Sequence, residues 1–243
     1  MSPRTSAPVS RRARPAKPPL GREVIVATAV TLLRTEGLER LTMRRLATAL
    51  DTGPGSLYVY FRNAEHLYAA LLDELLGEVD LSAVESEGAW EDRLAAVLAS
   101  YTAVLFEYPS IARLSVFTRP SGANSLAVFE ALLALLIEGR VDPAAAAWGI
   151  DLLVQYATAT AAEHGTRDQQ LSTADAETDM AIALDTVSLD SHPHLHDLRE
   201  VLVAGAPMER FRWGIDVLVA GIAARGTAAV PRSHRATGVP RRS

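Results

Sequence analysis

The fold of this chain is decided by one stretch, Leu41-Thr42-Met43-Arg44-Arg45-Leu46-Ala47-Thr48-Ala49-Leu50, then Asp51-Thr52-Gly53, then Pro54-Gly55-Ser56-Leu57-Tyr58-Val59-Tyr60-Phe61. Leu46, Ala47 and Leu50 are spaced as one stripe of a helix, and Thr42 before them is the expected N-cap. Asp51 fits the turn between two helices, where a residue must tolerate positive φ. The pattern predicts two short helices joined by a tight turn, with residues 22–36 as a longer support helix.

The second short helix presents an outward face with little bulk near its start. Leu57 and Phe61 have i, i+4 spacing and anchor it from behind, which leaves Ser56, Tyr58 and Tyr60 pointing outward. Such a face can enter the major groove of DNA. The same pattern also fits a plain helical hairpin whose aromatic residues only pack in a core, so the motif alone does not choose between the two.

The distribution of charge favours the nucleic-acid reading. Residues 1–63 carry a net charge of +7 and residues 64–243 a net charge of −12, which together give the overall −5. One end of the chain therefore suits a polyanion, and the overall pI of about 5.7 conceals this.

At Leu41 to Asn63 the sequence resembles the DNA-binding domain of the TetR family of bacterial repressors. The shared pattern is Leu-Thr-x-Arg-x-Leu-Ala-x-x-Leu, a turn, and Gly-Ser-Leu-Tyr-x-x-Phe-x-Asn. A second resemblance, to the tetracycline-repressor branch of the family, extends to the C-terminus. It rests on Trp90 opening a helix, on Thr118-Arg119-Pro120, and on the spacing of Phe211, Gly214, Ile215 and Leu218.

The resemblance assigns roles to residues of the motif. It implies that Arg44 and Tyr58 contact DNA, and that Thr42 and Met43 lie near the DNA backbone. The groove-facing surface that it implies consists of Pro54, Gly55, Ser56 and Tyr60. Where the family has a Lys after the Asn, this chain has Ala64, and we expect Arg62 to replace the lost phosphate contact.

Composition bounds the rest of the chain. There is no cysteine, which excludes disulfides, thiolate chemistry and Cys-type zinc sites. We expect a disordered basic arm at 1–19, a DNA-binding domain at 20–66, a helical effector-binding and dimerisation domain at 67–225, and a disordered basic tail at 226–243. The arm is a solvated tail or adds non-specific attraction to DNA, and it lacks the apolar segment of a signal peptide. A cytoplasmic protein is expected.

Periodicity is helical almost throughout and predicts an all-α protein. The expected helices are 22–36, 42–49, 54–60, 64–78, 90–107, 109–117, 124–138, 143–164, 194–203 and 207–224.

Two of these helices carry more apolar surface than one core needs. In 207–224, one stripe contains Phe211 and Ile215, and a second stripe contains Trp213 and Val217 on nearly the opposite side. Helix 143–164 is apolar around most of its surface. The simpler alternative is that both are central helices of a large monomeric bundle. A membrane-spanning role is excluded because acidic residues interrupt both helices. We expect a homodimer with a four-helix interface, which the resemblance also implies.

A candidate effector pocket lies in the middle helices. An apolar cavity with a few polar groups is the usual form of a small-molecule site. The expected lining is Tyr101, Leu105, Ile111, Leu114, Ser115, Thr118, Phe129, Leu132 and Gln155. For any one of these residues core packing is the better explanation, and only the resemblance raises the set above it.

The tetracycline-repressor branch departs from this chain at its ligand-binding positions. Its metal-chelating His falls at Val79 or Asp80, its second His at Ser115, and its drug-binding Asn at Val97; only Thr118 and the aromatic Tyr101 are kept. We therefore expect a small-molecule effector other than a magnesium–tetracycline chelate.

Other chemistry has little support. His192, His194 and His196 alternate in a way that could face a metal from an extended segment, but Pro193 and the loop setting favour exposure, so no metal or cofactor is assigned. No nucleophile elbow, P-loop, dinucleotide motif or His-Glu-x-x-His occurs. The expected function is a ligand-responsive repressor released from a palindromic operator. The alternatives are a DNA-associated structural protein without an effector and, last, an all-α enzyme.

Overall fold

The computed structural model describes residues 19–116, 121–169 and 180–225, with side chains described only to 163 in the second range. Within these ranges every regular element is helical, which confirms the all-α prediction. The chain divides into two compact units, Met1–Ala64 and Glu65–Ser243. Residues 1–18 of the expected arm 1–19 and the whole expected tail 226–243 lie outside the described residues.

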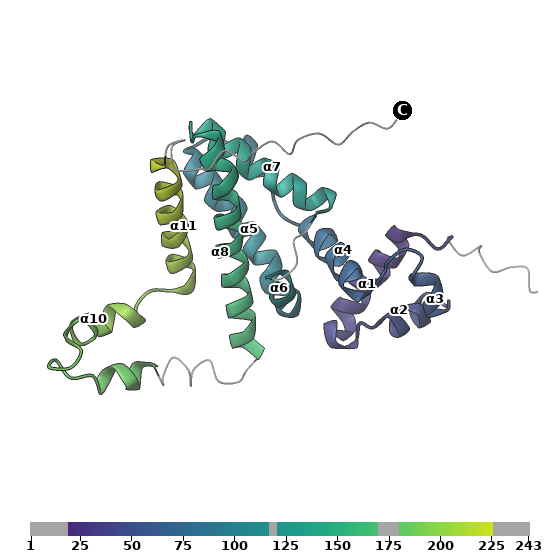
Figure 1. The fold of residues 1–243 in the computed structure, drawn as a ribbon, viewed down its shortest axis with the longest axis horizontal. Coiled ribbons are helices and arrows are strands. Elements are labelled where there is room, and N and C mark those ends of the chain that lie inside the picture. Colours follow the sequence, from purple (N-terminus) through teal and green to yellow (C-terminus); the bar gives the residue numbers. More distant parts are fainter. Residues whose placement is uncertain (1–18, 117–120, 170–179, 226–243) are drawn as a thin grey trace, which may run out of the picture. The chain divides into compact units, whose positions relative to one another are not determined.

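The described part of the first unit contains three α-helices, and the last two form a helix-turn-helix. It contains α1 (Arg22–Glu36), the short η2 (Leu38–Arg40), α2 (Met43–Ala49) and α3 (Pro54–Leu57) (Figure 1). Its largest fully buried side chains are Ile25, Leu41, Leu46, Leu57 and Phe61. Leu57 and Phe61 are therefore the inner anchors that the i, i+4 spacing predicts.

Two local predictions for the turn are confirmed. The Thr42 hydroxyl accepts a hydrogen bond from the backbone N–H of Arg45 at 3.1 Å, so Thr42 is the N-cap and α2 begins at Met43. Asp51 has a φ of 51°, in the left-handed region. The helix expected at 54–60 is shorter, because the N–H of Tyr60 bonds to the Leu57 carbonyl three residues back and tightens the last turn.

The second unit is a helical bundle. Its elements are α4 (Ala64–Leu76), η3 (Ser82–Glu85), α5 (Trp90–Glu107), α6 (Pro109–Ser115), α7 (Ala123–Glu138), α8 (Pro143–Gln169), α10 (Pro193–Val203) and α11 (Pro207–Ala224), with residues 180–185 also helical. Proline at the first positions of α6, α10 and α11 sets φ for the helix and loses no intrahelical bond there.

Several predicted boundaries are wrong by a few residues. Helix α4 ends at Leu76 instead of 78, α6 ends at Ser115 instead of 117, and α8 continues to Gln169 instead of 164. The η2 and η3 turns were not predicted, because single 3₁₀ turns are too short to show periodicity.

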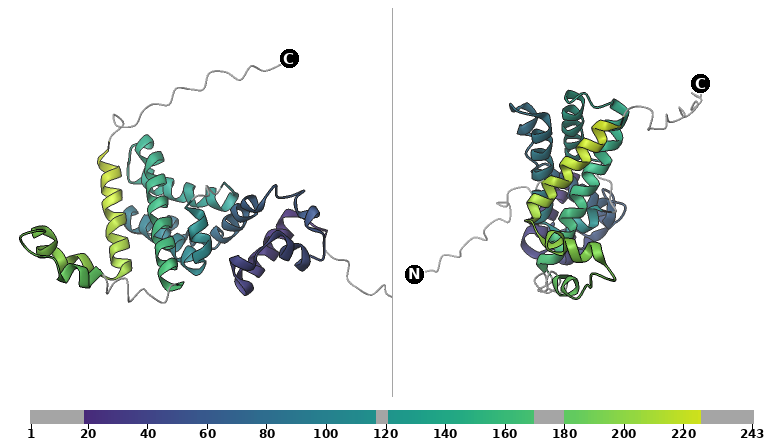
Figure 2. Two further views of the ribbon diagram at one scale, coloured as in Figure 1. Left: turned by 60° about the horizontal axis from the view of Figure 1, so that its bottom comes forward. Right: turned by 90° about the vertical axis from the view of Figure 1, so that its left-hand side faces the viewer.

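Helix α5 lies at the centre of this bundle and packs against α6, α7, α8 and α11 (Figures 1 and 2). Its buried face includes Leu94, Leu98, Tyr101 and Leu105. Its first residue packs closely: a Cβ on Gly139, at the end of α7, would lie 2.3 Å from the Trp90 ring. The buried Arg93 donates to the carbonyl of Val84 in η3 and to that of Ser86, the residue after η3, and it pairs with Glu138 of α7. These contacts hold α5, α7 and η3 together at one end.

Among the described helices, none has by itself the length and apolar composition needed to cross a bilayer. Helices α5 and α6 reach it only when taken together, across a bend of 117°.

Candidate DNA-binding surface and ligand-binding core

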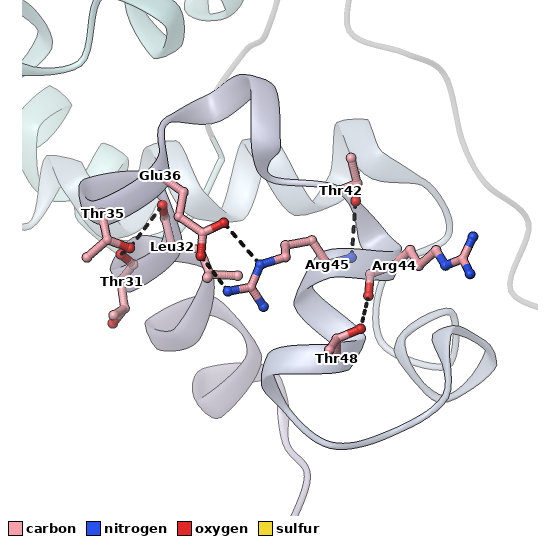
Figure 3. Close-up of polar contacts among 8 residues, drawn as sticks. All are labelled: Thr31, Leu32, Thr35, Glu36, Thr42, Arg44, Arg45 and Thr48. Carbon is pink, nitrogen blue, oxygen red and sulfur yellow. Dashed lines mark hydrogen bonds and ion pairs between the residues drawn. The ribbon is translucent and has the colours of Figure 1, made fainter.

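Two neighbouring arginines on α2 have opposite surroundings. Arg45 turns back toward α1, where its Nε donates to Glu36 Oε2 at 3.0 Å and its Nη2 pairs with the other carboxylate oxygen (Figure 3). This hydrogen bonding holds the pKa of Glu36 below its ordinary value. Arg44 is exposed and points away from the pair, and among the described residues its guanidinium has no ion-pair partner (Figure 3).

The expected groove-facing residues lie at the surface of the unit. Pro54 and Gly55 are exposed, Ser56 is half-buried, and Tyr58 is 52% exposed. No atom lies within 4 Å of a Cβ built on Gly55, so the start of α3 is open. Helices α2 and α3 therefore expose Arg44, which has no ion pair among the described residues, together with small residues at the start of α3 and the aromatic ring of Tyr58.

The remaining expected contacts are Thr42, Met43 and Arg62. Thr42 and Arg62 are exposed, and Met43 is half-buried. The hydroxyl oxygen of Thr42 accepts the hydrogen bond that caps α2. Its hydroxyl hydrogen can therefore be donated to an acceptor such as a phosphate oxygen.

Tyr60 has a structural contact that the sequence did not reveal. Its hydroxyl donates to the Leu20 carbonyl at 2.7 Å, and Arg22 donates to the Tyr60 carbonyl at 3.4 Å. The Arg22 guanidinium also lies 4.6 Å from the centroid of the Phe61 ring. Tyr60, although 37% exposed, therefore ties the start of α1 to the turn after α3.

In the second unit, most of the expected effector-site residues lie in the core. Leu105, Ile111 and Leu132 are buried, and Leu114 is half-buried. Tyr101 on α5 and Thr158 on α8 form a buried hydroxyl pair, with their oxygens 2.8 Å apart. Burial raises the pKa of the Tyr101 phenol, so it is neutral and can donate.

Ser115 is also buried, and its hydroxyl donates a hydrogen bond to the Ala112 carbonyl at 2.7 Å, as hydroxyls inside helices often do. Its oxygen keeps lone-pair capacity for a further donor. Thr118 lies outside the described residues.

Two of the expected pocket residues do not belong to this buried group. Gln155 lies on the exposed side of α8, where its Nε2 donates to Asp151 at 2.6 Å. Half-buried Phe129 lines a different, open groove of about 510 Å³, together with Ala147, Trp148, Ile150, Asp151 and Leu152. Helical periodicity could not separate these two faces of α8, because the helix is apolar nearly all round.

Helices α8 and α11 run side by side (Figures 1 and 2), and each of them carries exposed apolar residues. The predicted inner stripe of α11 is confirmed: Phe211, Ile215, Val219 and Ile222 are buried. Phe211 stacks on Tyr156 of α8, with centroids 5.7 Å apart. The second stripe faces outward, with Trp213 70% exposed and Val217 50% exposed, and Trp148 and Leu152 of α8 are exposed as well.

The histidine segment is not extended as a metal-facing strand would be. His194 and His196 lie in the first turns of α10, and the His192 ring nitrogen lies 2.9 Å from the Ser191 hydroxyl. Within the described part of the chain, no three His, Asp or Glu side chains are grouped as metal ligands would be.

Comparison with known proteins places both units in one family. Residues 25–71 match the profile of bacterial regulatory proteins of the tetR family, and residues 84–225 match the C-terminal domain described as tetracyclin repressor-like. The chain is 28% identical over 204 residues to the tetracycline repressor protein class C of Escherichia coli, covering 84% of this chain and 90% of that protein.

Solved structures agree with these matches. A Streptomyces coelicolor protein described as a transcription regulator, SCO7704, is 47% identical and has a TM-score of 0.74, covering 90% of this chain and all of that one. The TetR family protein ActR from the same organism, solved with actinorhodin, is 30% identical with a TM-score of 0.75, covering 87% of this chain and 100% of its own. The chain therefore belongs to the TetR family of DNA-binding bacterial regulatory proteins.

Proposed function

We propose that two copies of this chain bind a palindromic operator, each reading one half-site through the surface that carries Arg44, Ser56 and Tyr58. The observation that supports this most directly is the contrast between the two arginines: Arg45 is used within the fold, whereas Arg44 is held exposed and without an ion pair among the described residues. Arg44 and Arg62 supply phosphate contacts, which set affinity and salt dependence. Ser56 and Tyr58 supply contacts in the groove, which set sequence preference.

The proposed dimer forms through the exposed faces of α8 and α11. An apolar stripe that includes Trp148, Leu152, Trp213 and Val217 has no cover within the described protomer, and such stripes are buried by a partner in stable complexes. A two-fold pair would direct two heads at one DNA face, with half-site centres about 34–36 Å apart or a multiple of that distance.

The operator is found by selecting bound fragments from the source genome with the purified protein, followed by footprinting. Protection of a palindrome of defined length supports the repressor. Protection that grows with DNA length would instead indicate a DNA-coating structural protein, and monomers at micromolar concentration in sedimentation would overturn the two-head arrangement.

The proposed effector is a neutral, largely apolar molecule that carries hydroxyl or carbonyl groups. The buried polar groups near the expected pocket are the hydroxyls of Tyr101, Thr102, Ser115 and Thr158. The buried cation, Arg93, is already paired with Glu138. A charged ligand would find no buried partner of opposite sign among the described residues of this core, and burying an unpaired charge is costly.

Thermal unfolding with added ligands tests this chemistry. Actinorhodin, which the neighbour ActR binds, is a first probe, and tetracycline with Mg²⁺ is the second. A ligand that binds only the folded state raises the midpoint, and the stabilisation grows with the logarithm of the ligand concentration relative to its Kd. The buried Val97 and Ser115 stand where the tetracycline-repressor branch has its drug-binding Asn and its second His, so tetracycline with Mg²⁺ should give little shift. A large shift would contradict the proposed effector class.

A further inference from the structure

Helices α4 and α7 are joined by a hydrogen-bonded junction centred on Asp73. Its carboxylate Oδ1 accepts from the Ser125 backbone N–H at 2.9 Å and from the Ser125 hydroxyl. The Asn124 side chain returns the contact, since its Nδ2 donates to the Asp73 carbonyl at 3.0 Å. Ser125 is 1% exposed, so the junction is shielded from water on that side.

The junction is a helix cap supplied by another helix. The first N–H groups of a helix lack intrahelical partners, and a side-chain oxygen at the N-cap usually accepts one of them. Helix α7 has Gly122 at its N-cap and no side-chain cap of its own. Asp73 takes that place by accepting the N–H of Ser125, the third residue of α7, and its negative charge suits the helix N-terminus.

Glycine at position 122 is what lets the carboxylate approach. A Cβ built on Gly122 would lie 2.0 Å from Asp73 Oδ2, so any side chain there would displace the cap. Gly77 is similarly close, because its Cβ would lie 3.1 Å from Asn124 Nδ2. Glycines at positions 77 and 122 therefore leave room for the contact between α4 and α7.

The place of the junction in the chain gives it a role beyond stability. Helix α4 begins at Ala64, the last residue of the DNA-binding unit along the chain. Helix α7 begins a few residues after α6, which carries Ile111 and Ser115 of the proposed effector core. Asp73 therefore links the helix that leaves the DNA-binding unit to the helix that follows the effector core.

We propose that Asp73 is a positioning residue for DNA binding: its cap on α7 fixes the setting of α4, and a change in the first turn of α7 changes operator affinity through it. This inference rests on the repressor function proposed above. Coupling between two sites is reciprocal, so operator binding must in turn stabilise the first turn of α7. That consequence can be measured without knowing the effector.

The test is hydrogen–deuterium exchange of the full-length protein, with and without the selected operator fragment, read at residues 121–130. In the wild type, DNA should slow exchange at the Ser125 amide, whose hydrogen the Asp73 carboxylate binds. Asp73→Ala should speed that exchange by about five-fold without DNA, the factor that corresponds to losing one cap, and should remove its response to DNA. Asp73→Asn, which keeps an acceptor oxygen, should restore part of the response.

The matched control is Glu74→Ala, which removes the next carboxylate on α4, an exposed one. It should leave both exchange and operator affinity as in the wild type. The inference is overturned if α7 of the wild type exchanges equally with and without bound DNA, or if Asp73→Ala merely lowers the melting temperature while the response to DNA persists. Failure of the wild type to bind any fragment would instead remove the proposed function itself.

Discussion

Arg44 and Arg45 are neighbours in α2, but they point in different directions and therefore have different roles. Arg45 points to α1 and closes on Glu36, while Arg44 is exposed on the other side of α2 (Figure 3). A substitution at either position removes one positive charge, but only one of the two charges is free for a phosphate. Substitutions at these two positions therefore distinguish the loss of a DNA contact, at Arg44, from the loss of a stabilising ion pair, at Arg45.

Arg44→Ala should weaken binding to every DNA sequence by a similar factor, roughly ten-fold, because phosphate contacts carry no base information. The slope of log Kd against log salt should fall by about one for each head. Titration of labelled operator and of unrelated DNA at several salt concentrations measures both quantities. Arg45→Ala is the matched control and should lower the melting temperature first; an Arg44→Ala protein with unchanged affinity at matched salt would rule out the docking surface.

Glu36→Gln should make the DNA-binding unit less stable at neutral pH and less sensitive to acid. The bond from Arg45 lowers the pKa of Glu36 below its ordinary 4.5, so the stabilisation is fully present above pH 4.5 and is lost as the pH falls through the lowered value. Thermal unfolding followed by circular dichroism at pH 7 and pH 3 checks this. Glu39→Gln, on exposed η2, should leave the acid dependence unchanged, and equal behaviour of the two variants would show that the ion pair contributes nothing measurable.

At the scale of elements, the end of α7 depends on a glycine that packs against an aromatic ring. Gly139→Ala should destabilise the second unit by about 1–3 kcal/mol, because its new methyl group would lie 2.3 Å from the Trp90 ring and the ring must move. Chemical denaturation measures the loss. In a Trp90→Leu background the same substitution should cost far less, and an equal cost in both backgrounds would assign the effect to the backbone instead.

The elements that the sequence predicted are those whose signals are local. The Thr42 cap spans three residues, and the positive φ of Asp51 belongs to one residue. Contacts between distant segments were not predictable: the Tyr60 hydroxyl reaches a carbonyl 40 positions away, and the Asp73 cap joins residues 52 positions apart. Their donors and acceptors carry no periodic pattern, so only the packed fold reveals them.

The expected effector site shows the same limit. Its buried members come from amphipathic helices whose inner stripe is legible, as with Tyr101 and Leu105 on α5. Gln155 was misplaced because α8 is apolar on several faces and its polar residues do not mark which one is inside. The position of a residue around such a helix is set by tertiary packing.

At the scale of the whole molecule, the exposed face of α8 and α11 determines how many heads meet the DNA. Trp213→Glu should yield monomers, because a charge at the centre of the proposed interface would be buried without a partner. Operator affinity should fall by about 100-fold or more, since the two heads would no longer bind as one ligand. Sedimentation velocity and operator titration measure the two effects.

Leu126→Glu on α7 is the matched control, because Leu126 is another exposed apolar residue, at 60%, outside that face. It should remain dimeric. Monomers from Leu126→Glu together with dimers from Trp213→Glu would move the interface to α7.

The same face provides an optical signal of assembly. The chain has three tryptophans, and two of them, Trp148 and Trp213, stand in water on the free protomer at 56% and 70% exposure. The third, Trp90, is half-buried beside Gly139. Indole emission shifts to the blue when water leaves the ring, so dilution of the unlabelled protein should redden its fluorescence as pairs separate. The dissociation constant of the pair could then be read from the native chain alone.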